Sequence, residues 1–162
     1  MPEKTNASRI LERHGINFDL VEYQVDPDHL DALHVANELG QDIAGVYKTL
    51  VLHGDKTGHF VCVIQGDKEV DLKKAAKISG NKKVAMIPMK ELLPLTGYIR
   101  GGCTAIGMKK NFPVFLDLNA LEQENIYISA GKRGLQIKLN PNDYVKVTKA
   151  VIGDIINQPE EE

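Results

Sequence analysis

The stretch Val46-Tyr47-Lys48-Thr49-Leu50-Val51-Leu52 has the composition of a buried β-strand, apart from one lysine. β-Branched, aromatic and other apolar residues fill the remaining positions, and such residues favour a strand. An ammonium group that is buried without a partner costs several kcal/mol. Lys48 must therefore reach water, a carboxylate or a ligand. The simplest interpretation is that it lies near a strand end and extends into water, and the alternative of interest is that it binds an anionic ligand.

The rest of the chain predicts an ordinary soluble domain around this strand. Its 162 residues favour one domain, and its 43% hydrophobic and 26% charged content is typical of globular proteins. Its apolar runs are too short to span a bilayer, and we see no signal-peptide core, so we expect no membrane association. Cys62 and Cys103 do not make a disulfide framework, which favours a cytoplasmic location with both thiols reduced.

Local signals for capping, turns and alternation predict many short strands with interspersed helices. We expect helices over residues 5–14, 31–39, 72–79, 88–93 and 141–150, and strands over residues 18–23, 46–52, 59–64, 83–86, 114–117, 126–128 and 135–139. In the last of these strands, Gln136 is expected on the polar side of a half-buried strand. The pattern predicts the α+β class: a single mixed β-sheet or barrel flanked by helices over residues 1–157. A disordered acidic tail is expected at 158–162.

Two glycine-rich loops are the next notable feature. The first glycine loop covers residues 101–107 and the second covers residues 129–134. Such loops aim backbone N–H groups into a concavity that holds phosphate or a developing oxyanion. The alternative is that each is only a tight turn that needs positive φ. Ser129, Lys132 and Arg133 add hydroxyl and cationic donors to the second loop, and together these features indicate a phosphate-bearing substrate.

Charge is distributed unevenly along the chain. Residues 73–110, the basic segment, contain nine Lys or Arg residues and one acid, which gives +8 against −10 for the remainder. A one-sided basic surface in an acidic chain is typical of proteins that bind a polyanion. For the three lysines of the helix at 72–79, the alternative of a merely solvated face is favoured.

Cys103 is the strongest candidate for a protein nucleophile. The glycines before it expose it, and Arg100 would lower its pKa if the two side chains met. The alternative is a buried thiol that fills the loop. The five histidines show no zinc-type spacing, and the chain lacks a phosphate-binding P-loop, a dinucleotide fingerprint and a serine nucleophile elbow. We therefore expect no metal and no cofactor.

These motifs resemble the YbaK/EbsC family across essentially the whole chain and in the same order. The matching segments are Val46-Tyr47-Lys48-Thr49-Leu50, Asp71-Leu72-Lys73-Lys74-Ala75-Ala76-Lys77, Thr96-Gly97-Tyr98, Gly101-Gly102, Gly107-x-Lys109-Lys110 and Ile126-Tyr127-Ile128-Ser129-Ala130-Gly131-Lys132-Arg133-Gly134-Leu135. YbaK-like members are free-standing Cys-tRNA(Pro) deacylases related to the editing domain of bacterial prolyl-tRNA synthetase. The resemblance implies a trans-editing enzyme in translation, with charged tRNA and prolyl-tRNA synthetase as partners and no DNA partner.

The resemblance also implies roles for individual residues. Lys48 matches the lysine that holds the 3′-terminal nucleotide of charged tRNA, and Gly102 matches a glycine whose N–H faces the reacting carbonyl. Ser129 matches a site serine, and Tyr23 matches a tyrosine that lines the pocket. The full set implied to contact the substrate is completed by Thr49, Gly101, Gly131, Lys132, Arg133 and Gln136.

In this family the cysteinyl thiol of the substrate is thought to attack its own ester, which releases tRNA and a cyclic thiolactone. Cleavage by water, editing of another small amino acid such as alanine, and a non-catalytic module that binds tRNA or the synthetase stay open as alternatives. Three positions depart from the family pattern: Cys103 replaces an aliphatic residue, Ala105 replaces a proline, and Gln136 replaces an aspartate. The segment 29–33 does not align, so the aromatic residue that contacts the aminoacyl group has no match here.

Overall fold

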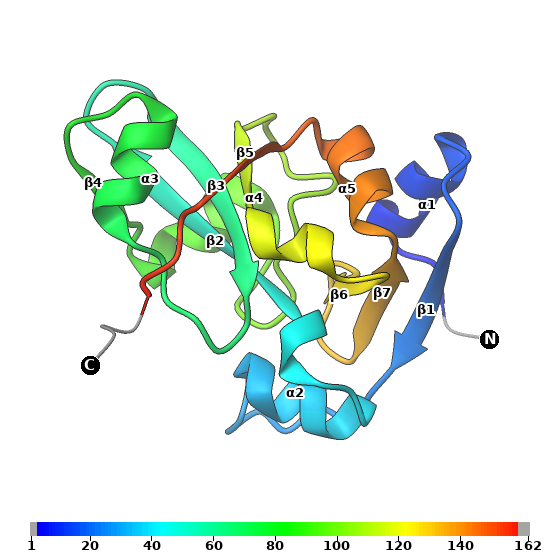
Figure 1. The fold of residues 1–162 in the computed structure, drawn as a ribbon. Helices are drawn as coiled ribbons and strands as arrows, with labels where there is room; N and C mark the ends of the chain where they lie inside the picture. Colours follow the sequence, from blue (N-terminus) through cyan, green and yellow to red (C-terminus); the bar gives the residue numbers. More distant parts are fainter. Residues whose placement is uncertain (1–2, 159–162) are drawn as a thin grey trace.

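The fold is built on a β-hairpin that contains Lys48. In this computed structural model, which describes residues 3–158, β2 (Tyr47–Gly54) pairs antiparallel with β3 (Gly58–Gln65). The hairpin is the centre of a five-stranded sheet with the order β4-β2-β3-β5-β8 (Figure 1). β4 (Val84–Met86) is antiparallel to β2, whereas β5 (Val114–Asp117) and β8 (Val151–Gly153) continue the sheet in parallel from β3. The sheet is therefore mixed, as the sequence predicts.

A smaller sheet lies beside the start of β2. It contains β1 (Phe18–Glu22), β7 (Leu135–Leu139) and β6 (Ile126–Ser129), all antiparallel, in the order β1-β7-β6. A single parallel bridge between Val46 and Tyr127 connects the two sheets. Among the described residues the strands form two open sheets and no closed barrel, so the barrel alternative is wrong. The α+β class and the mixed sheet are confirmed by the solved structures of the same fold reported below.

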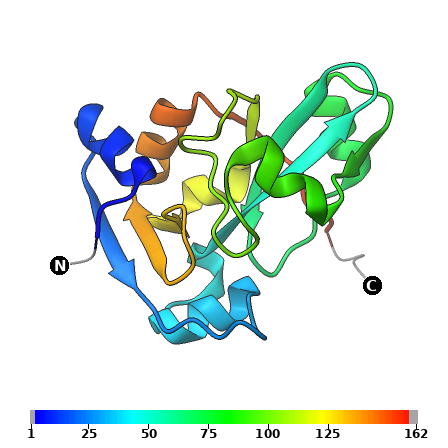
Figure 2. The ribbon, with the colours of Figure 1, turned by 180° about the vertical axis from the view of Figure 1, so that it is seen from behind.

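Helices cover the ends and faces of these sheets. The α-helices are α1 (Asn6–Arg13), α2 (Ala32–Leu39), α3 (Leu72–Ser79), α4 (Leu92–Thr96) and α5 (Pro141–Thr148), and short 3-10 turns occupy Ile43–Gly45, Met89–Glu91 and Leu118–Glu122. Figure 1 shows α2 at one end of the molecule, next to the start of β2. In Figure 2, which shows the molecule from behind, the segment between β4 and β5 with α4 lies in front of the hairpin.

Most helix boundaries follow from capping residues. Asp31 and Asp71 accept hydrogen bonds from backbone N–H groups at the starts of α2 and α3. Gly40 and Gly80 end the same helices in the left-handed conformation. These signals are local in sequence, so the predicted bounds of both helices are confirmed to within one residue.

The structure differs from the prediction where tertiary contacts decide. α5 ends at Thr148 rather than at residue 150, because Lys149 adopts φ 58° and the chain then enters β8, a strand that the sequence did not indicate. The helix expected at 88–93 is a 3-10 turn followed by α4. Gln136 is only 5% exposed, so its predicted position on a solvated face is wrong. Pro159 and the three glutamates of the expected tail lie outside the described residues.

The main core lies between the two sheets and the pair α1 and α5. Leu11 of α1 and Tyr144 of α5 are completely buried there against Ile128 and Ile137 of the small sheet. A second cluster, with Phe60, Cys62 and Ile155, fills the space between the large sheet and α3. Within the described residues, none of the helices has the length and apolarity that crossing a bilayer requires.

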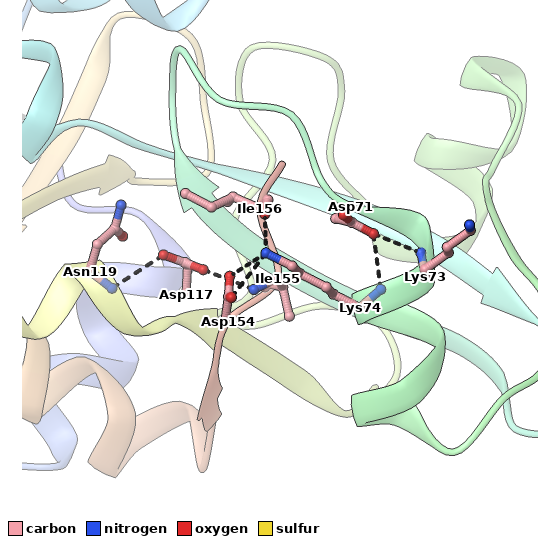
Figure 3. A network of polar contacts seen from close by, with 8 residues as sticks. All are labelled: Asp71, Lys73, Lys74, Asp117, Asn119, Asp154, Ile155 and Ile156. Atoms are coloured by element: carbon pink, nitrogen blue, oxygen red, sulfur yellow. Dashed lines mark hydrogen bonds and ion pairs between the residues drawn. The ribbon is translucent and has the colours of Figure 1, made fainter. Parts of the chain in front are cut away.

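Two carboxylates in different environments help to hold residues 154–156: Asp117 connects them to β5, and Asp154 connects them to α3 (Figure 3). Asp117 is 2% exposed and accepts hydrogen bonds from the N–H groups of Ile155 at 3.0 Å and Asn119 at 3.2 Å. Asp154 lies near the surface, where Lys74 donates to its carboxylate at 2.9 Å. The ammonium of Lys74 also donates to the carbonyl of Ile156 at 2.9 Å.

These environments predict that replacing the two carboxylates lowers the free energy of unfolding by unequal amounts. Asp117→Ala leaves two N–H groups without an acceptor and should lower the free energy of unfolding by about 3 kcal/mol. Asp154→Ala removes only a partly exposed ion pair and should cost less than about 1 kcal/mol. Urea unfolding followed by circular dichroism measures both values, and equal costs for the two variants would contradict this assignment.

Candidate functional site

A cavity of about 380 Å³ opens between the start of β2, the start of α2 and the first glycine loop. Its wall includes residues 46–51 at and just before the start of β2, residues 30–32 before and at the start of α2, Arg100, Gly101 and Cys103. Ser129 and Gln136 of the small sheet complete its polar side. A volume of this size is in the range of sites that hold a small molecule or the end of a larger one.

Lys48 is the cation of this cavity. It is the second residue of β2, opposite Ile64, and its side chain is half-buried. Burial lowers the pKa of its ammonium below the ordinary lysine value, and the carboxylates of Glu69 and Asp67 partly oppose this shift. No ion pair of Lys48 within 4.0 Å occurs in the described part of the chain. Lys48 therefore lines a cavity as a poorly solvated cation, which favours the anion-binding interpretation.

Ser129 and Gln136 are brought together by the register of the small sheet. They are opposite each other in the pairing of β6 with β7, so their side chains lie on the same face. Ser129 is 9% exposed, and its Oγ accepts a hydrogen bond from the N–H of Gly131 at 3.1 Å. Gln136 is more deeply buried, and no protein group among the described residues donates to its Oε1.

The two glycine loops pack against each other at Gly102. A Cβ atom at this position would lie 3.0 Å from the Cα of Lys132 and 3.2 Å from the N of Arg133, so any side chain would push the loops apart. The N–H of Gly102 donates to the carbonyl of Ile99 at 2.9 Å. That amide is already used, so the expectation that it faces a reacting carbonyl does not hold in this structure.

The amides on either side of Gly102 are available instead. Gly101 and Cys103 both line the cavity, and neither N–H has an acceptor in the part of the chain that the structure describes. Gly101 adopts φ 85°, a conformation that glycine reaches without strain. The first glycine loop is therefore a tight turn, and two of its residues that line the cavity, Gly101 and Cys103, carry N–H groups without an acceptor among the described residues.

Only some of the residues implied by the family resemblance meet in the cavity. Lys48, Thr49, Gly101, Ser129 and Gln136 line it. The remaining ones do not, namely Tyr23, Gly102, Gly131, Lys132 and Arg133.

Each of the residues outside the lining has another structural role. Tyr23 continues β1, where its N–H donates to the carbonyl of Gly134 at 3.0 Å. Gly131 has φ 104° and leaves room for the ring of Tyr98. Arg133 donates from Nε to the carbonyl of Arg100 at 2.8 Å, and Lys132 approaches Glu3 at 3.8 Å. They support the loops around the cavity.

Several lining residues gave no signal in the sequence. Leu30 and Asp31 come from the segment that did not align with the family, so no motif pointed to them. Met86 and Met89 form an apolar rim and are 44% and 58% exposed. Their exposure is visible only in the structure, where large apolar side chains in solvent often mark a binding surface.

Cys103 has the properties of a protonated thiol. Burial raises its pKa to about 12, and a hydrogen bond with Thr96 opposes this only in part. The prediction that Arg100 lowers this pKa is therefore wrong. Cys62 in the core also has a pKa raised by burial to about 12. In the described residues, no group of three or more His, Cys, Asp or Glu side chains is close enough to hold a metal ion.

The basic segment contributes to the outer surface more than to the cavity. Among its cations, Arg100 lines the cavity wall. Lys74 is half-buried in its contact with Asp154, and the other cations of the segment are exposed. A surface with many exposed cations, together with a half-buried cation in a cavity, suits a long polyanion whose end enters the cavity.

Comparisons with known proteins agree with this chemistry. The family model of the aminoacyl-tRNA editing domain matches residues 26–147, which is more than half of the chain. EbsC of Enterococcus faecalis (strain ATCC 700802 / V583), named as a candidate Cys-tRNA(Pro)/Cys-tRNA(Cys) deacylase, is 48% identical over 153 residues that cover 94% of this chain and 93% of the relative.

Solved structures show the same fold at lower identity. The hypothetical protein APE2540 has a TM-score of 0.86 at 23% identity, over 94% of this chain and 100% of that one. A candidate trans-editing enzyme for prolyl-tRNA synthetase has a TM-score of 0.82 at 24% identity, over 97% of this chain and 100% of that one.

The raised thiol pKa predicts slow modification of Cys103. At pH 8 a thiol with a pKa near 12 has about 10³-fold less thiolate than an ordinary cysteine, and the thiolate is the form that alkylating reagents attack. Iodoacetamide labelling followed by peptide mass spectrometry should therefore proceed far more slowly in the native protein than in guanidinium. Native labelling within tenfold of the unfolded rate would contradict this description of Cys103.

Proposed function

The chain belongs to the aminoacyl-tRNA editing domain family, and on that premise we propose that it is an aminoacyl-tRNA deacylase that acts in trans on Cys-tRNA(Pro) and on Cys-tRNA(Cys). The observation that carries the proposal is the single cavity that unites Lys48, two free backbone amides, Ser129 and Gln136. An ester joined to a polyanion needs a cation for phosphate and N–H donors for an oxyanion, and this cavity supplies both.

In this proposal Lys48 binds the phosphate of the 3′-terminal nucleotide. Its ammonium is partly desolvated and lacks an ion-pair partner among the described residues, so a phosphate replaces hydration that folding has removed. The exposed cations of the basic segment hold the tRNA backbone outside the cavity. Lys132 and Arg133 contribute to this outer contact rather than to the cavity.

The reaction is assigned to the thiol of the substrate. The cysteinyl sulfur, after losing its proton, attacks the ester carbonyl carbon, and the C–O bond to the terminal ribose breaks. The ribose oxygen takes a proton, and a cyclic thiolactone is released. The amides of Gly101 and Cys103 stabilise the carbonyl oxygen, and Gly102 allows the two loops to approach. Orientation of an intramolecular nucleophile supplies about 7–11 kcal/mol of the barrier, so no protein nucleophile is required.

The protonated state of Cys103 supports this assignment. With a pKa near 12, its thiol carries little nucleophilic thiolate at neutral pH. Ser129 accepts from Gly131, and the described residues place no histidine in the cavity wall that would act as its base. The role proposed for Ser129 and Thr49 is hydrogen bonding to the ribose and the acyl group.

We further propose that residues 1–157 are the editing domain, that the protein works in the cytoplasm, where tRNA is charged, and that it meets prolyl-tRNA synthetase there. A protein that clears the errors of one synthetase benefits from capturing the released tRNA before it is used. The structural likeness to a candidate trans-editing enzyme for that synthetase supports this partner.

The experiment that tests the function is a turnover panel with cysteinyl, alanyl and prolyl esters of tRNA(Pro). We expect rapid loss of the cysteinyl ester and little loss of the others, measured by acid precipitation of labelled aminoacyl-tRNA. Preferred loss of the alanyl ester would move the assignment to alanine. Salt-sensitive binding of all three without turnover would show a non-catalytic module and refute the proposal.

Blocking the substrate thiol shows whether this thiol or a water molecule is the nucleophile. S-Methylcysteinyl-tRNA(Pro) has the same ester but no attacking sulfur, so its deacylation should fall to the uncatalysed rate. Thin-layer analysis of the labelled product should show the thiolactone and its hydrolysis product from the cysteinyl ester alone. Unchanged turnover of the methylated ester would instead identify water as the nucleophile.

Lys48 predicts a distinct pH dependence of tRNA binding. Because its pKa is lowered in the folded protein, the charge and the affinity for uncharged tRNA should decline at a lower pH than an ordinary lysine would allow. Lys48→Arg stays charged and should keep its affinity over the same range, measured by fluorescence anisotropy. Lys48→Ala should reduce kcat/KM about 10- to 100-fold at neutral pH.

Lys56→Ala is the matched control, since Lys56 is an exposed residue of the hairpin turn. It should behave as the wild type in both measurements. Parallel pH profiles for the wild type and Lys48→Arg would show that the ammonium of Lys48 does not contact the phosphate.

A further inference from the structure

Gln136 lines the cavity and carries a buried hydrogen-bond acceptor, Oε1, that no described protein group uses. It lies on the central strand of the small sheet, opposite Val21 on one side and Ser129 on the other. Its neighbours Leu135 and Ile137 point to the other face, into the main core. The side chain is 95% buried, given its 5% exposure, and no described protein group donates to Oε1.

An acceptor in this position is costly unless a ligand satisfies it. A buried polar atom without a partner destabilises a fold, and nearly all such atoms in folded proteins have a partner. Gln136 lines the same cavity as Lys48 and Ser129, so a ligand held there reaches its neighbourhood. The unpaired carbonyl therefore points to a donor on the ligand.

Lys48 and Thr49 are the half-buried polar side chains of the wall, and the proposed function assigns them to the phosphate and to the ribose or acyl group. Ser129 Oγ accepts from Gly131, and the carboxylate of Asp31 is exposed and accepts from the N–H of His34 at 3.2 Å. Oε1 of Gln136 is therefore the buried side-chain acceptor that no described group occupies. The strongest hydrogen-bond donor that the substrate offers to this oxygen therefore decides which substrates the cavity selects.

The reacting end of a cysteinyl ester offers a thiol, an α-amino group and a ribose hydroxyl. A thiol is a weak donor, and in the proposed reaction it loses its proton to attack. The ribose lies on the phosphate side, next to Lys48. The α-amino group is a strong donor attached to the same carbon as the reacting carbonyl, and it needs an acceptor when it leaves water.

We propose that Gln136 recognises the α-amino group of the aminoacyl ester through its Oε1, an inference that rests on the proposed deacylase function. A hydrogen bond at this group fixes rotation about the Cα–carbonyl bond and so directs the thiol toward the carbonyl carbon. A neutral amide accepts from an amine or an ammonium and leaves the charge of Lys48 free for phosphate. A carboxylate at residue 136 would instead compete for that cation.

The test compares two substrates on two proteins. Cysteinyl-tRNA(Pro) and its desamino analogue, 3-mercaptopropionyl-tRNA(Pro), share the thiol and the ester and differ in the α-amino group. The wild type should show about tenfold or more lower kcat/KM on the desamino analogue, because its buried acceptor stays unpaired there. Gln136→Met removes the acceptor at similar volume and should treat both substrates alike, within about twofold. Gln41→Met, an exposed change after α2, should keep the discrimination of the wild type.

The Tm measured without substrate separates substrate recognition by Gln136 from a purely structural role, because the two roles predict opposite changes in Tm. Replacing an unpaired buried amide by an apolar side chain should leave the Tm of Gln136→Met unchanged or raise it. A lowered Tm would show that the amide stabilises the fold and would overturn the inference. Full discrimination in Gln136→Met, or none in the wild type, would overturn it as well.

Failure of the proposed deacylase function would give a different experimental result from failure of the role of Gln136. A wild type that deacylates neither ester overturns the deacylase assignment and this inference with it. Turnover of cysteinyl-tRNA(Pro) with equal turnover of the desamino analogue overturns the role of Gln136 alone.

Discussion

The site depends on a cation that folding has partly removed from water. β2 holds Lys48 between the smaller sheet and the first glycine loop, where burial lowers its pKa. Glu69 and Asp67 are near enough to stabilise the charge, but in the described residues neither forms an ion pair with it. A charge in this state retains binding energy for an anion, because a bound anion supplies stabilisation that reduced hydration and the two distant carboxylates provide only in part.

The second constraint is the close contact of the two glycine loops. Gly102 lies against the backbone of Lys132 and Arg133, and the guanidinium of Arg133 ties the loops together through the carbonyl of Arg100. This contact brings the free amides of the first loop to the same cavity as the cation. Because both loops follow strands or helices of the rigid core, the donors are fixed before any ligand arrives, which is the condition for electrostatic stabilisation of a transition state.

The sequence predicts those parts of the fold whose signals are local. The hairpin around Gly54 and Gly58 and the caps at Asp31 and Asp71 follow from turn and capping chemistry within a few residues. β8 pairs in parallel with a strand more than thirty residues earlier, so no local pattern marks it. The same reason explains the Lys149 break at the end of α5.

The residues of the candidate site also divide into those that local sequence signals reveal and those that depend on tertiary packing. Lys48 stands out because a charge interrupts an apolar strand, and the glycine loops stand out by composition. The burial of Gln136, the engaged amide of Gly102 and the raised pKa of Cys103 depend on what the fold packs against them. Tyr23 and Lys132 match a motif, but their side chains lie outside the cavity wall, because a motif fixes position along the chain and not the direction of a side chain.

The most direct measurement is a crystal structure of the protein with 3′-cysteinylamino-3′-deoxyadenosine 5′-monophosphate, whose amide linkage resists cleavage. The phosphate should lie within hydrogen-bond distance of Lys48 Nζ, with the acyl oxygen at the amides of Gly101 and Cys103. A nucleotide bound elsewhere, with the Lys48 ammonium in solvent, would contradict the central claim that this half-buried cation holds the end of the tRNA.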